Sequence, residues 1–125
     1  MELDLRVQHH DDWAVVLVSG EVDLATCPQL RDVLAGLVEQ GVYHLVVDLE
    51  QVSFLDSSGI GVLISVRRRI REHGGSLRLT APSPHVRRVL ELTGITTLLP
   101  TYATLDEATP VEPLDQLTSR NVNVE

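Results

Sequence analysis

The run from Asp56 to Gly61 holds the residues of this sequence that are best suited to chemistry. A carboxylate, Asp56, precedes two hydroxyls, Ser57 and Ser58, where an apolar stretch gives way to a helical pattern. Because N–H groups at a helix start lack partners and attract negative charge, an Asp or Ser there is typical of a helix cap. Gly59 and Gly61 would each lower helix stability by about 1 kcal/mol, which indicates that another group approaches the backbone closely.

Apolar and acidic side chains near this run are candidates for a binding surface. Phe54 and Leu55 stand in a polar stretch, so we expect them to be exposed apolar contacts. Glu21 and Asp23 follow the end of an apolar segment, where loops often carry function. Two interpretations of this acidic pair remain open: a partner surface near Asp56, or a simple turn.

Familiar catalytic patterns do not fit the sequence. The surroundings of Ser57 differ from the G-x-S-x-G elbow of serine hydrolases, and His73 and His85 lack an acid partner in triad order. The chain contains no lysine, so the pair Gly59 and Gly61 cannot belong to a Walker phosphate loop. We therefore expect no enzymatic activity and no catalytic residue.

Metal-ligating residue types are equally sparse. Cys27 is the single cysteine, which excludes a disulfide framework and leaves no partner for a zinc cluster. His9 and His10 are adjacent and would point to opposite sides of an extended chain, so a solvated turn is the favoured interpretation. The sequence predicts no metal site and no cofactor.

The charge distribution limits the possible partners. The net charge is -8 and aromatic residues make up 3%, which disfavours non-specific DNA binding and base-stacking modules. All 10 basic residues are arginines, and the stretch 65–90 is strongly basic. Arg67 to Arg71 form either a solvated helix face or a patch for an acidic partner.

The same features bear on location. The acidic start, Met1 to Asp4, shows no secretory signal, and no apolar run approaches the ~20 residues that would span a bilayer. We expect a cytoplasmic protein that makes no contact with a membrane.

Hydrophobic periodicity predicts one domain over residues 1–108. Helices alternate with strands, which is typical of an α/β fold: a mixed four- to five-stranded sheet with about four helices packed on it, beginning with an antiparallel hairpin. Residues 109–125 lose this period, and we expect an acidic, disordered C-terminal tail and a monomer or weak dimer. The predicted strands are 3–7, 13–18, 44–49, 76–80 and 96–99; the predicted helices run from Pro28 to Gly41, over 58–73, from Ser83 to Gly94 and from Leu105, with a loop over 50–56.

Several motifs together resemble the signature of the STAS-domain anti-sigma factor antagonists, also called anti-anti-sigma factors. The most specific of them is Phe54-Leu55-Asp56-Ser57-Ser58-Gly59-Ile60-Gly61. The resemblance covers residues 3–108 and implies a single STAS-like domain. The other matching pieces are Gly20-Glu21-Val22-Asp23, Val47-Asp48-Leu49, Gly74-Gly75, Pro82-Ser83-Pro84-His85-Val86 and Leu92-Thr93-Gly94-Ile95.

The resemblance implies a regulator. Members of the family bind an anti-sigma factor that is also a serine kinase, and this binding frees a sigma factor. The kinase ends the binding by phosphorylating a serine, which here is Ser57, with Ser58 as the runner-up and supporting hydroxyl; a PP2C-type phosphatase reverses the step. The alternative is a non-phosphorylated STAS scaffold in a larger signalling complex. The implied partner-binding residues are Glu21, Asp23, Phe54, Leu55, Asp56, Ser57, Ser58, Gly59, Ile60 and Gly61.

Elementary electrostatics is consistent with such a switch. A phosphate on Ser57 would add about -1.5 to -2 charges beside Asp56. We expect free N–H groups at the helix start to hold this phosphate without unfolding. A partner that buries Asp56 and Ser57 would then face a desolvated dianion, so phosphorylation should end binding without a change of fold.

Overall fold

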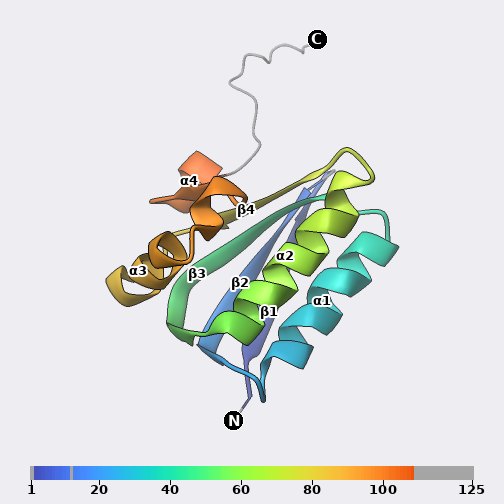
Figure 1. Ribbon diagram of the computed structural model, residues 1–125. Coiled ribbons are helices and arrows are strands. Elements are labelled where there is room, and N and C mark those ends of the chain that lie inside the picture. Colours follow the sequence, from blue (N-terminus) through green and yellow to red (C-terminus); the bar gives the residue numbers. More distant parts are fainter. Residues whose placement is uncertain (1, 12, 109–125) are drawn as a thin grey trace.

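The computed structural model describes residues 2–11 and 13–108, and it forms one α/β unit (Figure 1). Five strands make one sheet in the order β1-β2-β3-β4-β5. The pair β1–β2 is antiparallel and all other pairs are parallel, so the expected mixed sheet is confirmed. The strands are β1 (Asp4–His10), β2 (Trp13–Val22), β3 (His44–Leu55), β4 (Ser76–Thr80) and β5 (Thr101–Tyr102). The helices are α1 (Cys27–Glu39), α2 (Ser57–Arg71), α3 (Pro84–Leu92), the 3-10 helix η1 (Ile95–Thr97) and α4 (Leu105–Ala108).

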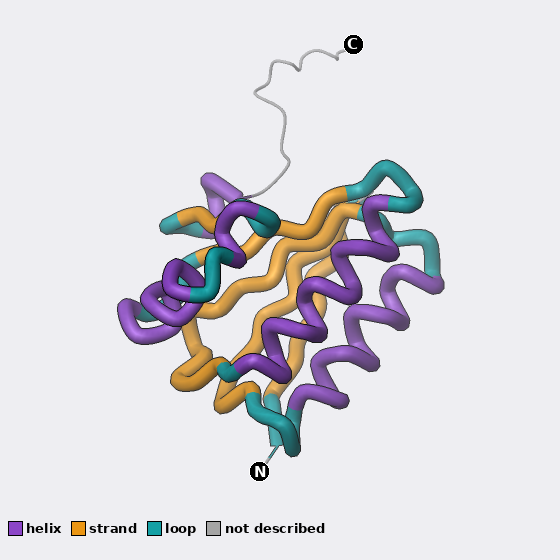
Figure 2. The backbone as a smooth tube through the Cα atoms, in the orientation of Figure 1, coloured by secondary structure: helices purple, strands orange, loops and turns teal. Residues whose placement is uncertain are grey.

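The helices cover the two faces of the sheet unequally. On one face α1 and α2 lie side by side, and their apolar stripes share a core with alternate residues of β2 and β3 (Figures 1 and 2). Val86 and Leu90 of α3 join the same core. On the opposite face α4 packs through Ala108 against Val15 and Val46, which leaves part of that face open. Because side chains alternate along a strand, successive residues of β3 lie on opposite faces of the sheet.

Local signals explain where the long helices begin and end. Pro28 and Pro84 occupy first turns, where a missing N–H is harmless, and the Ser83 hydroxyl accepts from the Val86 N–H at 3.3 Å. Gly41 and Gly94 adopt positive φ just after helices, as predicted for helix stops.

The third strand is much longer than predicted. Residues 50–55, expected to be a loop, continue β3, and β2 likewise extends to Val22. Register shifts between the two strands give β3 one extra residue between Asp48 and Gln51 and another, Ser53, between Val52 and Phe54. Such bulges break the period-two pattern while pairing continues, which is why the sequence pattern missed them.

The expected strand over 96–99 is wrong. Residues 95–97 form η1, and the next strand is β5, two residues long. The chain turns because Gly94 takes φ 76°, and the Thr97 hydroxyl then donates to the Gly94 carbonyl at 2.8 Å. Ile95 and Leu99 are buried, so burial of apolar side chains alone did not distinguish this turn from a strand.

The predicted tail, 109–125, lies outside the described residues. No helix in the described part of the chain is long and apolar enough to cross a membrane.

Candidate functional site

The site is built on two neighbouring strands that extend together past the rest of the sheet. Glu21 lies opposite Phe54 and Val22 lies opposite Leu55 in the parallel pairing of β2 with β3. The pairing continues one step further, because the Asp56 N–H donates to the Val22 carbonyl at 3.2 Å. The segments around Glu21 and Asp56 are therefore held side by side by backbone hydrogen bonds.

Asp56 caps α2. Its Oδ1 accepts from the N–H groups of Ser58 at 3.0 Å and Gly59 at 3.3 Å, and from the Ser58 hydroxyl. The Ser58 hydroxyl is the main cause that lowers the pKa of Asp56 below its ordinary value of 3.8; the Gly59 and Ser58 N–H groups add to it, and partial desolvation opposes it. The capping interpretation of this carboxylate is confirmed.

The two serines have different environments. Ser58 is half-buried and its hydroxyl is committed to Asp56, whereas Ser57 is exposed and its hydroxyl makes no hydrogen bond with any described residue. The Ser57 hydroxyl is thus the one presented to solvent at the helix start. One expectation is wrong: the Ser58 and Gly59 N–H groups are not free to hold a phosphate, because Asp56 already occupies them.

Gly59 explains part of the glycine pattern. A Cβ at Gly59 would lie 2.6 Å from both Leu55 Cδ1 and Val22 Cγ1, closer than real side chains approach. The group that approaches this backbone is therefore the protein's own core. At Gly61 a Cβ would meet nothing within 4 Å, so the structure gives no packing reason for that glycine.

The predicted partner-binding residues divide into exposed and buried sets. Phe54 is 40% exposed, as expected, but Leu55 is 2% exposed and packs in the core, so its expected exposure is wrong. Ile60 is also buried in the core. These buried residues position the surface and do not form it. The exposed or half-buried members are Glu21, Asp23, Phe54, Asp56, Ser57, Ser58 and Gly61.

Asp23 serves a turn. Its Oδ1 accepts from the N–H groups of Ala25 at 2.9 Å and Thr26 at 3.0 Å, and the Thr26 hydroxyl donates to the Glu21 carbonyl at 2.7 Å. These bonds fix the connection from β2 to α1 and support the turn interpretation of Asp23. The turn exposes Leu24 at 77%, a residue that the sequence analysis missed. The sequence could have indicated this exposure, because Leu24 is a single leucine within a polar turn.

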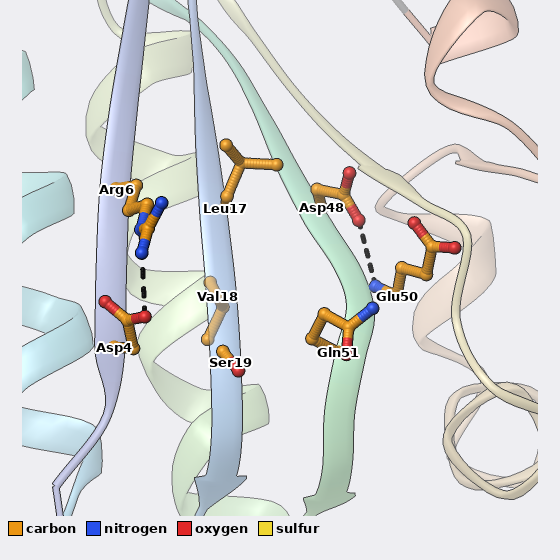
Figure 3. Close-up of a pocket in the computed structure, with 8 residues that line it drawn as sticks. All are labelled: Asp4, Arg6, Leu17, Val18, Ser19, Asp48, Glu50 and Gln51. Atoms are coloured by element: carbon orange, nitrogen blue, oxygen red, sulfur yellow. Dashed lines mark hydrogen bonds and ion pairs between the residues drawn. The ribbon is translucent and has the colours of Figure 1, made fainter.

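A separate hollow lies on the open face of the sheet (Figure 3). Its volume of about 230 Å³ is below the 300–1,000 Å³ typical of small-molecule pockets. Within it Asp48 accepts from the Glu50 N–H at 2.9 Å, and Arg6 lies 3.7 Å from Asp4. No cluster of three metal-ligating side chains occurs among residues 2–11 and 13–108. The lining residues are Asp4, Arg6, Leu17, Val18, Ser19, Asp48, Glu50 and Gln51.

Comparison with known proteins identifies the family and the fold. The family model described as "STAS domain" matches residues 4–108, and the chain therefore belongs to the STAS-domain family. An anti-sigma-B factor antagonist of Staphylococcus epidermidis is 30% identical over 112 residues, covering 90% of this chain and 100% of that protein.

Two solved structures show the same architecture. An anti-sigma factor antagonist from Mycobacterium paratuberculosis is 36% identical with a TM-score of 0.78, covering 85% of this chain and 90% of its own. The Bacillus cell fate determinant SpoIIAA, in its phosphorylated form, is 27% identical with a TM-score of 0.66, covering 84% and 96%. The expected STAS-like fold is thereby confirmed.

Proposed function

We propose that this protein is an anti-sigma factor antagonist whose binding is switched off by phosphorylation of Ser57. The observation that carries the proposal is the contrast between the two serines: Ser57 is exposed and unbonded among the described residues, while Ser58 is held by the capping carboxylate. A kinase that reaches the start of α2 therefore finds one free hydroxyl. The names of its relatives supply the class of partner, an anti-sigma factor.

The switch works through charge. Unphosphorylated, the surface around Glu21, Leu24, Phe54 and Ser57 offers two exposed apolar side chains beside acidic groups. A phosphoryl group adds about -1.5 to -2 charges next to Asp56, whose carboxylate already holds the local N–H donors. A partner covering Ser57 must then desolvate two neighbouring anions, so the complex dissociates.

The partners follow from this cycle. The binding partner is an anti-sigma factor with serine kinase activity, and a PP2C-type phosphatase restores the unmodified serine. The protein acts in the cytoplasm as a binding module, without catalysis of its own and without direct contact with nucleic acid or membrane. SpoIIAA, a structural relative, is known in a phosphorylated form, which supports a phosphorylation cycle.

Phosphosite mapping after reaction with the cognate kinase and ATP tests the proposal. We expect one phosphate on Ser57, none in Ser57→Ala, and full modification of Ser58→Ala. Ser57→Ala should bind the anti-sigma factor like the wild type, and Ser57→Asp should bind more weakly. Modification confined to Ser58 would move the switch by one residue; binding without any phosphorylation would favour the scaffold alternative.

A further inference from the structure

The basic stretch of the sequence forms a groove at the far end of α2. Arg67 and Arg71 lie one turn apart on α2, and Arg78 reaches the same hollow from β4. The hollow has a volume of about 380 Å³ and continues into a second one of about 510 Å³ that includes Arg68 and Glu72. We call the first hollow the arginine groove. Its other lining residues are Gly75, Ser76, Leu77, Thr97, Leu98, Pro100 and Tyr102.

The described part of the chain leaves the charge of the arginine groove largely uncompensated. The ion pairs within residues 2–11 and 13–108 join Arg6 to Asp4 and Arg31 to Asp32, and none involves Arg67 or Arg71. Arg78 donates from Nη1 to the Ala108 carbonyl at 3.1 Å, a bond that orients its guanidinium without neutralising it. Among the residues that the structure describes, several guanidinium groups therefore share one hollow without a carboxylate within ion-pair distance.

The groove also offers apolar surface. Leu98 is 40% exposed, Pro100 is exposed and Tyr102 is half-buried beside the arginines. Guanidinium groups bind carboxylates through paired N–H donors, and apolar side chains bury against an aromatic ring and a proline. A peptide segment carrying both acidic and apolar residues satisfies both halves of this surface.

Longer polyanions fit the molecule less well. The chain carries a net charge of -8, so a nucleic acid or an anionic membrane would meet repulsion from most of its surface. A short acidic segment is confined to the groove. Contacts at the groove then dominate, because charges beyond about 8 Å are screened at physiological salt.

We propose that the arginine groove is a second docking surface, which binds an acidic, leucine-containing segment of a partner protein independently of Ser57. Ser57 begins α2, whereas Arg67 and Arg71 belong to its last turns, about 15 and 21 Å further along the axis at 1.5 Å of rise per residue. The helix itself is seen in full in Figure 1. A phosphate on Ser57 lies beyond the screening length from the groove. The docked segment therefore stays bound in both states of the switch.

Fluorescence anisotropy with the full chain tests this proposal. The probe is a labelled nine-residue peptide that alternates Glu and Leu, and the reference peptide carries Gln in place of Glu. We expect the Glu peptide to bind about tenfold more tightly than the Gln peptide, and Arg67→Gln/Arg71→Gln to lose about tenfold in affinity for it. Ser57→Asp should leave the affinity unchanged.

Arg69→Gln is the matched control, because Arg69 lies on the same helix, is exposed and lines neither hollow. It should change the affinity less than about twofold, since only distant charge is removed. An equal loss in Arg69→Gln, or no preference for Glu over Gln, would overturn the proposal.

Other occupants of the groove have their own readouts. Tighter binding of a deoxythymidine decamer or of phosphatidylserine vesicles than of the Glu peptide would assign the groove to a polyanion. Sedimentation that shifts toward monomer in Arg67→Gln/Arg71→Gln would assign it to a second copy of this chain. Markedly tighter peptide binding by Glu112→Gln/Asp115→Asn would assign it to the chain's own acidic residues. Each of these results would overturn the proposal.

Discussion

The carboxylate of Asp56 links local stability to pH. Because its pKa lies below 3.8 in the folded protein, the cap contributes stability above the unfolded-state pKa, and this contribution disappears as the pH falls through the folded value. Ser58→Ala removes the hydroxyl that lowers this pKa most, so the midpoint should rise toward 3.8. An NMR titration of the Asp56 carboxyl carbon measures it. Ser57→Ala is the control and should leave the midpoint in place; equal shifts in both variants would contradict the assigned hydrogen bond.

Substitution of Phe54 should lower the affinity for the partner and leave the stability of the fold nearly unchanged. Phe54 is 40% exposed, so Phe54→Ala should change the free energy of unfolding by less than about 1 kcal/mol. Affinity for the anti-sigma factor should fall at least about tenfold, because aromatic anchors dominate interface energy. Leu92→Ala is the control: Leu92 is an exposed leucine on α3 that belongs neither to this face nor to the arginine groove, and its substitution should leave the affinity unchanged. Calorimetric titration with the anti-sigma factor measures the affinity of both variants. Unchanged affinity in Phe54→Ala/Leu24→Ala would show that the surface around these two residues is not the binding surface.

At the scale of elements, the start of α2 depends on close packing against the paired strand ends. Gly59→Ala would place a Cβ 2.6 Å from the buried Leu55 and Val22, and we expect a loss of about 1–2 kcal/mol in the free energy of unfolding. Gly61→Ala meets open space and should instead gain up to about 1 kcal/mol from helix propensity. Urea unfolding of the two variants measures whether each substitution lowers or raises the free energy of unfolding. A Gly59→Ala variant that is more stable than the wild type would contradict this, because Leu55 and Val22 would then move aside at little energetic cost.

The same element shows what sequence patterns can and cannot reveal. The helices were predictable because prolines, glycines and a capping Asp act locally, whatever the rest of the chain does. The end of β3 was not, because Val52 and Leu55 are buried three residues apart and only the bulged pairing with β2 makes that spacing a strand. The order Asp56, Ser57, Ser58 predicts the candidate site. Which serine is free depends on one hydrogen bond that the sequence does not specify.

At the scale of the whole molecule, we expect the proposed switch to require no rearrangement. Ser57 is exposed and outside the core, so phosphorylated protein should keep its melting temperature within about 4 °C, corresponding to less than about 1 kcal/mol. Amide NMR shifts should change around residues 21–26 and 53–61 and remain constant in β1, β4 and α3. Shift changes spread through the sheet would instead indicate a conformational switch.

The hydrogen-bonded strand ends also bear on how related signalling pathways stay insulated from each other. The paired ends of β2 and β3 are packed from inside the core by Val22, Leu55 and Gly59. The side chains that lie on the surface are Glu21, Leu24 and Phe54. After gene duplication the outer side chains can diverge at little expense to folding, and the inner ones cannot. Copies of this domain can thus acquire separate partners and keep the proposed phosphorylation chemistry unchanged. Crosstalk between parallel pathways would then be set by a few surface side chains.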